Sequence, residues 1–152
     1  MIWLLAFPVV WLIGWVALPH GRYVETLDAN GRNWPGFFIV REDAPNREAV
    51  WAQEQYEAQT KWRWLPLLWL VDLPGRAFPR IAWFSRRLEL MGHEIEVQHI
   101  GLHGGDRASA RRHEAEVLVR HYPAFKGWTA DQCLYALEQR SDRARQWLSR
   151  NG

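Results

Sequence analysis

The chain of 152 residues has the length of one ordinary domain, which excludes a large multidomain enzyme. Apolar residues make up 48% of it and charged residues 24%, so neither a disordered tail nor a polytopic membrane protein fits. The formal net charge of +2 is too weak to indicate a nucleic-acid-binding protein. The unusual feature is the presence of 11 tryptophans, and because indole is amphipathic they favour a membrane surface or a protein interface.

An uncharged apolar run covers residues 2–18. Its length reaches the lower limit of about 17 residues for a helix that spans a bilayer. Pro8 and Gly14 would weaken a helix in water, but membrane segments tolerate both residues. We expect residues 1–20 to form an N-terminal apolar helix that is either an uncleaved membrane anchor or a segment packed on a neighbouring subunit or on this chain's own core. Residues 21–152 then form a single domain.

The next part of the chain is punctuated by turn-forming residues. Residues 20–36 predict a loop or a weak hairpin around Asn30-Gly31, and the β-favouring run of residues 37–40 predicts a short strand. A turn that ends in a plausible N-cap follows, so we expect a helix from Arg47 to about Trp62, close to Pro66.

Helical patterns dominate the remaining sequence. The apolar stretch of residues 62–73 is too short to span a bilayer and favours a buried or interfacial helix. Apolar residues recur at three- and four-residue steps over 81–99, which predicts a long helix. Further helices are expected over 106–120, capped by its first residue, and over 129–148, opened by a capping box. The fold class is therefore mainly α, of the α+β kind, with four to five helices after the strand.

One helical face carries a possible metal-binding motif. Gln53 and Glu57 are four residues apart and therefore share a face, with Glu54 beside them. The usual zinc-binding version has histidine at the first and fifth positions, as ligands, and glutamate at the second, as the general base. Both imidazoles are absent here, and such a run alone is usually an ordinary solvated helix face.

The surroundings of this motif resemble a known family. The order of segments resembles that of the short minimal gluzincin-like metallopeptidases of bacteria and phages. A short strand and a charged loop come first, then the helix with Glu54, a Trp- and Leu-rich segment, and a helix carrying Glu89 and His93. The resemblance covers about residues 36–96. It implies a zincin-like arrangement in which a strand rims a cleft above the metal-binding helix and the next helix supplies a third ligand.

The resemblance also implies roles for individual residues. Glu54 matches the general base, Gln53 and Glu57 stand at the positions of the two histidine ligands, and Glu89 matches the third ligand. His93 lies one turn after Glu89 and could face the same cleft. An oxygen-rich set of this kind favours Mn²⁺, Ca²⁺ or no metal over tight Zn²⁺. The expected cofactor is therefore none or a weakly bound divalent cation, with zinc as one candidate.

Two classes of function follow. The first is a non-catalytic zincin-like structural or interaction protein, a pseudoenzyme. The family's distribution favours a phage virion component, and the apolar N-terminal run favours a membrane-associated one. The second is a membrane-anchored metallopeptidase-like hydrolase with Glu54 as its base. The expected partners are a membrane or other protein subunits, with no nucleic acid. The tryptophans expected at that interface are Trp3, Trp11, Trp15, Trp62, Trp64 and Trp69.

The histidines offer a rival metal site, because five of the six lie between residues 93 and 121. His99 and His103 are four residues apart, but Gly101 between them weakens the helix that would align them. We expect these histidines to lie at the surface or at helix ends.

Overall fold

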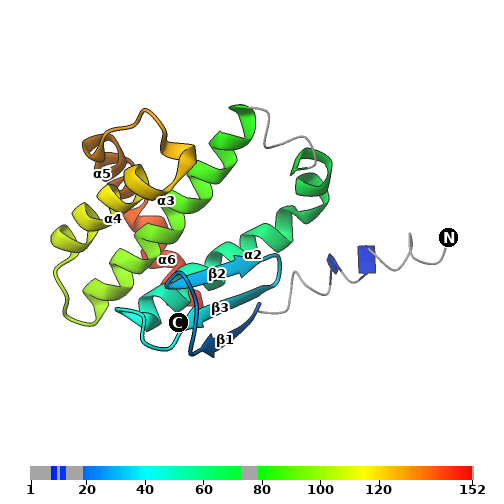
Figure 1. Ribbon diagram of the computed structural model, residues 1–152, viewed down its shortest axis with the longest axis horizontal. Coiled ribbons are helices and arrows are strands. Elements are labelled where there is room, and N and C mark those ends of the chain that lie inside the picture. Colours follow the sequence, from blue (N-terminus) through cyan, green and yellow to red (C-terminus); the bar gives the residue numbers. More distant parts are fainter. Residues whose placement is uncertain (1–7, 10, 13–18, 73–78, 152) are drawn as a thin grey trace.

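The computed structural model describes residues 8–9, 11–12, 19–72 and 79–151, and side chains 65–82 are outside that description. Over the described residues the chain forms five α-helices and one small three-stranded sheet (Figure 1). The predicted mainly helical α+β class is confirmed.

The sheet contains β1 (His20–Val24), β2 (Gly31–Trp34) and β3 (Phe37–Arg41) in the order β1-β3-β2. β1 is parallel to β3 and β2 is antiparallel to it. The hairpin turns at Pro35-Gly36, where Gly36 has a φ of 76°, so the predicted hairpin around Asn30-Gly31 is wrong, and Asn30 lies in the loop that precedes β2. The sequences of β1 and β2 are polar and do not show the apolar alternation of a strand. Each becomes a strand because it pairs with the apolar strand β3.

Helix α2 (Arg47–Asp72) extends well past the predicted end near Trp62 and continues through Pro66. Proline has no N–H, so the carbonyl of Trp62 loses its usual helical donor. The indole Nε1 of Trp11 donates to that carbonyl at 3.2 Å, and the indole of Trp62 donates to the carbonyl of Trp11, also at 3.2 Å. This reciprocal pair supplies the missing hydrogen bond at the proline.

The predicted N-terminal apolar helix lies mostly outside the described residues. Within the described part, Trp11 is hydrogen-bonded to Trp62 of α2, as described above. None of the helices in residues 8–9, 11–12, 19–72 and 79–151 combines the length and the apolar character needed to cross a bilayer.

The other helices are α3 (Pro79–Leu102), α4 (Arg107–His121), α5 (Ala130–Glu138) and α6 (Ser141–Asn151), with a 3₁₀ turn at Pro123–Phe125. Both predicted helix starts are confirmed. The Asp106 side chain accepts from the Ala108 amide at 2.9 Å, and Thr129 and Gln132 form the capping box.

The predicted single helix over 129–148 is wrong, because the chain turns between α5 and α6. The turn brings Ala144 and Leu148 of α6 onto Met91 and Ile95 of α3. Burial of these apolar side chains outweighs the helical propensity of the connecting residues.

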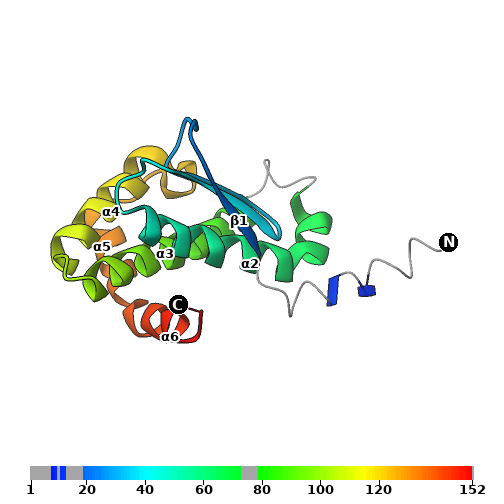
Figure 2. The same cartoon turned by 90° about the horizontal axis from the view of Figure 1, so that it is seen from below.

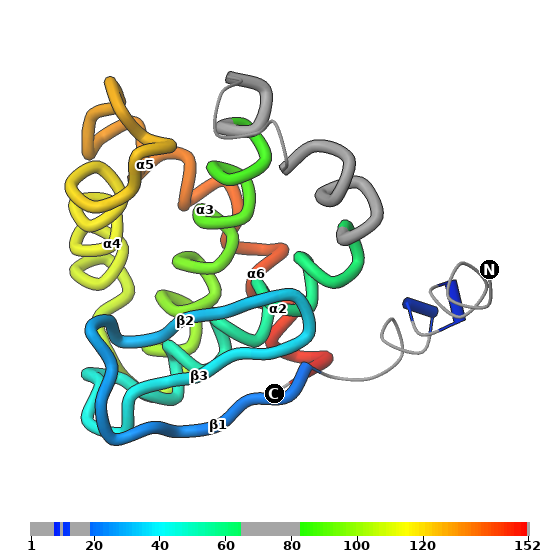
Figure 3. The backbone as a smooth tube through the Cα atoms, turned by 45° about the vertical axis from the view of Figure 1, so that its right-hand side comes forward, coloured from blue at the N-terminus to red at the C-terminus, as the bar shows by residue number. Residues whose placement is uncertain are grey.

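Helix α3 is central to the arrangement. It lies between the sheet-covered helix α2 on one side and α4 and α5 on the other, and α6 packs along it (Figures 1, 2 and 3). One apolar core lies under the sheet, around Phe38 and Val40, and another lies among α3, α4 and α5, around Leu118 and Phe125. The surfaces of α2, α3 and α4 between these cores carry polar side chains.

A buried ion pair fastens three of these helices. Glu94 of α3 is fully buried and accepts two hydrogen bonds from the Arg111 guanidinium of α4, at 2.9 and 2.7 Å. The Ser141 hydroxyl at the start of α6 donates to the same carboxylate at 2.8 Å, and the Gln98 amide donates at 2.7 Å. Glu94 is therefore fully engaged in holding α3, α4 and α6 together.

Candidate functional site

Several ionisable side chains of α2, α3 and α4 converge between the two cores, and most of them are buried. We call this group the buried acidic cluster; its members are Glu54, Glu57, Glu89, His93, Glu96 and Glu114. The three members on α3 are four and three residues apart and therefore share one helical face. Gly92 allows α2 and α3 to approach, because a Cβ atom there would overlap the Glu57 carboxylate.

The structure brings together the predicted base, Glu54, and the four predicted metal ligands. Glu54, Glu57, Glu89 and His93 act on one another electrostatically within the cluster. Gln53 lies at its edge, where its Nε2 donates to Glu57 Oε1 at 3.1 Å. The nitrogen of its amide is therefore turned toward the Glu57 carboxylate.

Strand β2 closes the α2 side of the cluster. The Asn33 amide donates to Glu57 Oε2 at 2.9 Å and also to Glu54. Lys61 donates to the Asn33 side-chain oxygen, and its ammonium is 3.9 Å from Glu57 Oε2. A Cβ atom at Gly31 would overlap the Glu54 side chain, so the strand lies directly against it. Glu54 is consequently only 6% exposed.

His93 is held on both sides of its ring. Its Nδ1 is 2.6 Å from Glu114 Oε2, and its Nε2 is 3.1 Å from the Tyr122 hydroxyl. Donor atoms of His93, Glu96 and Glu114 all lie within 4.8 Å of one another. These three side chains are the most compact set of candidate metal ligands in the cluster.

Burial sets the protonation of the cluster. Burial, with the charge of neighbouring carboxylates, raises the pKa of Glu54 to about 7 and the pKa values of Glu89 and Glu96 to about 8. Burial opposes the charge on His93, but the hydrogen bond and charge of Glu114 outweigh it and raise the pKa of the imidazole to about 9. The metal-free cluster therefore retains protons near neutral pH because it is short of positive charge.

Two of the three compact donors were missed by the sequence reasoning. Glu96 could have been found, because residues 89, 93 and 96 have the spacing of one helical face. Glu114 lies on α4, and its participation depends on how that helix is rotated against α3, which no local pattern specifies.

The predicted interface tryptophans are only partly covered by the structure. Trp3, Trp15 and the side chain of Trp69 lie outside the described residues. Trp11 and Trp62 bind each other, as described above. Trp64 is 47% exposed, and its ring meets Phe84 edge-on with centroids 6.0 Å apart.

The expectation that Gly101 weakens the helix that would align His99 and His103 is wrong. Helix α3 continues through Gly101 to Leu102, and the two imidazole rings stack with centroids 4.3 Å apart. Burial and the neighbouring His103 lower the pKa of His99.

Comparisons of the chain with protein-family models, with curated proteins and with solved structures find no match.

Proposed function

We propose that this protein is a non-catalytic, zincin-like structural or interaction protein whose helical core binds a divalent cation. One observation carries the proposal: five carboxyl groups meet in the buried acidic cluster, and the described residues bring two cationic neighbours to them, His93 and Lys61. Buried charges in proteins are normally paired or coordinate a metal, and a divalent cation would supply the missing charge.

The enclosure of the cluster favours a structural cation over a catalytic one. A catalytic metal needs an open coordination position and access for substrate, whereas structural sites are closed by protein ligands. Glu54 is covered by β2 and bound by Asn33, and His93 is only 4% exposed. Over the described residues Glu54 is only 6% exposed, and this burial favours the structural cation and makes the hydrolase the less supported alternative.

The donor chemistry favours a hard cation. His93, Glu96 and Glu114, with Glu89 nearby, would supply mainly carboxylate oxygens and one imidazole nitrogen. Carboxylates suit Mg²⁺, Ca²⁺ and Mn²⁺, and among these Mn²⁺ is the ion we expect to accept the nitrogen most readily. Binding requires neutral imidazole and ionised carboxylates, so it should release protons.

The test combines metal analysis with thermal unfolding. The purified chain should contain a divalent cation by elemental analysis, or should take up Mn²⁺ after treatment with a chelator. Mn²⁺ at 100 times its dissociation constant stabilises a folded protein by about 2.7 kcal/mol, which raises the Tm by roughly 5–11 °C for a chain of this size.

Matched variants on α4 make the test specific. Glu114→Gln removes a carboxylate from the cluster, whereas Glu116→Gln makes the same change at an exposed position of the same helix. The Mn²⁺-dependent rise in Tm should disappear in the first variant and persist in the second. Equal responses in the two variants, or no response in the wild type, would contradict a buried cation site.

Glu54→Gln separates the two functional classes. In a structural protein the change should be neutral or stabilising, because it removes a buried carboxyl whose ionisation is unfavourable. Peptidase activity in the wild type that this substitution abolishes would instead support the hydrolase.

The interaction half of the proposal is supported by exposed aromatic side chains. The rings of Trp34 and Phe37, both on the β2–β3 hairpin, stack on each other with centroids 5.9 Å apart. Trp83 on α3 is 60% exposed, and Trp64 on α2 is also exposed. Two assays compare the wild type with Trp64→Ala. Co-sedimentation with lipid vesicles tests for a membrane partner, and measurement of the oligomeric state tests for association with other copies of the chain. Unchanged behaviour of the variant in both assays would remove Trp64 from any interface.

A further inference from the structure

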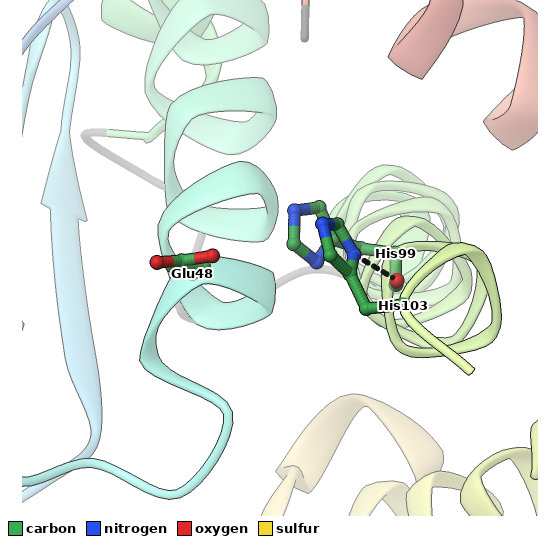
Figure 4. Close-up of side chains that lie close together, drawn as sticks. All are labelled: Glu48, His99 and His103. Atoms are coloured by element: carbon green, nitrogen blue, oxygen red, sulfur yellow. Dashed lines mark hydrogen bonds between the residues drawn. The ribbon is translucent and has the colours of Figure 1, made fainter. Parts of the chain in front are cut away.

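A second group of metal-ligating side chains lies away from the buried acidic cluster, where the start of α2 meets the end of α3. Glu48 is in the first turn of α2, His99 is in the last turn of α3, and His103 follows directly after that helix. Their candidate donor atoms all lie within 4.8 Å of one another. Figure 4 shows both imidazole rings projecting from the end of α3 toward the turn of α2 that carries Glu48.

The backbone fixes the orientation of His103. Its Nδ1 is 2.9 Å from the carbonyl oxygen of His99, an acceptor, so Nδ1 carries the proton and donates it (Figure 4). The other ring nitrogen, Nε2, then has a free lone pair. In histidines that bind metals, the N–H of the other ring nitrogen usually donates a hydrogen bond to a carbonyl or carboxylate in this way, which holds the ring in place.

The end of α3 is shaped so that this ring stays at the surface. Gly104 has a φ of 87°, which reverses the chain, and the Gly105 amide donates to the Ile100 carbonyl at 3.0 Å. The chain therefore leaves the helix directly after His103 and does not cover it. His103 and Glu48 are exposed and His99 is half-buried, so an ion from solvent can reach all three.

The three side chains share one groove of about 350 Å³. Arg47 also lines it, but its guanidinium packs over the Tyr23 ring at 5.5 Å from the centroid. The positive charge of Arg47 therefore lies over the Tyr23 ring. The carboxylate of Glu48 is the negative group on the α2 side of the two histidines.

We propose that Glu48, His99 and His103 form a surface zinc site. Two imidazoles with one carboxylate match the preference of Zn²⁺ for nitrogen with oxygen ligands, and three protein ligands leave one tetrahedral position for water or for a group from a partner. The bound ion would join the beginning of α2 to the end of α3. This site is accessible and rich in nitrogen, whereas the buried acidic cluster is closed and rich in oxygen, so the two sites should prefer different cations.

The test is calorimetric titration of the full chain with ZnCl₂ after removal of metals by a chelator. Titrations use the Glu114→Gln background as well as the wild type, so that any ion in the buried acidic cluster is counted separately. One Zn²⁺ should bind in both backgrounds. His99→Ala and His103→Ala should each weaken this binding by more than about tenfold, since even a lost outer-shell partner costs roughly 10- to 100-fold.

Two further variants identify the ligand set. Glu48→Gln should also weaken Zn²⁺ binding, which shows that the carboxylate participates. His113→Ala removes an exposed histidine of α4 and should leave the affinity unchanged. Co²⁺ in place of Zn²⁺ should give visible absorption bands of a four-coordinate ion, and His103→Ala should abolish them.

Several results would overturn the site. Absence of Zn²⁺ binding in the wild type is one, and equal affinities of the wild type and His103→Ala are another. A loss of affinity in His113→Ala as large as in His103→Ala would show scattered binding to surface histidines only. None of these results affects the Mn²⁺ response of the buried acidic cluster, so the two proposals fail separately. Circular dichroism of each variant checks that the helices persist, and His103→Gln repeats the test should the alanine variant unfold.

Discussion

Stability of the metal-free protein should fall as the pH rises from 6 to 8. Burial raises the pKa of Glu96 to about 8, from an ordinary value of 4.5, so the folded chain keeps a proton over this range that the unfolded chain has already lost. A group that binds more protons in the folded state makes the free energy of unfolding decrease with pH. The contribution of Glu96 is therefore complete below about pH 4.5 and is lost as the pH passes through 8.

The size of the effect follows from the pKa difference. One retained proton changes the free energy of unfolding by about 1.4 kcal/mol per pH unit, and less as the folded pKa is approached, which gives about 2 kcal/mol between pH 6 and 8. For a chain of this length the Tm should fall by about 4–8 °C. Glu89 acts in the same direction, and so does His93, whose charge stabilises the fold and is lost as the pH rises through about 9.

Urea unfolding at several pH values, in the presence of a chelator, measures this dependence. Glu96→Gln should flatten it, whereas Glu116→Gln should follow the wild type. Saturating Mn²⁺ should also flatten it, because a bound cation keeps the carboxylates ionised in the folded state. A metal-free stability that is constant or rises between pH 6 and 8 would refute this account of the cluster.

Other parts of the fold give equally direct expectations. Arg111→Ala leaves the Glu94 carboxylate buried without its guanidinium and should cost about 3–5 kcal/mol in urea unfolding; a loss below about 1 kcal/mol would mean that water replaces the guanidinium. Phe125→Ala removes a fully buried ring and should cost about 3–5 kcal/mol, measured in the same way, with a small loss indicating that the core collapses around the gap. Cys133 is fully buried, and burial raises the pKa of its thiol, so a thiol reagent should label it only at the rate of unfolding; fast labelling of the folded chain would contradict this packing.

The parts of the fold that were predictable depend on interactions between near neighbours in sequence. The Asp106 cap joins residues two apart, and the box at Thr129 joins residues three apart. Sequence patterns record such contacts directly. The period of α3 likewise follows from its own apolar residues.

The parts that were missed depend on partners far away in the chain. Strand β1 is polar and exists through its parallel pairing with β3, and α2 passes Pro66 where the indole of Trp11 meets the freed carbonyl. The turn between α5 and α6 exists because α6 packs back on α3. Each of these features is decided by tertiary contacts that no local window contains.

The candidate site was likewise predictable only where it depends on local spacing. Order and helical spacing were enough to bring Glu54, Glu57, Glu89 and His93 together, since they lie on two helices that pack side by side. Predicting the role of Glu114 would have required the rotation of a third helix, α4, about its own axis. The stacked pair near Glu48 forms because α3 continues through Gly101, which the low helix propensity of glycine did not predict.

The carbonyl of Trp62 has a consequence for the order in which the chain assembles. That oxygen faces the Trp11 indole where α2 continues on both sides of Pro66, so the contact requires this part of the helix to be formed. Trp11 precedes α2 in the chain, so its hydrogen bonds with Trp62 can form only after α2 has been synthesised. This contact therefore joins an earlier segment to a later one and cannot form while α2 is still missing from the growing chain.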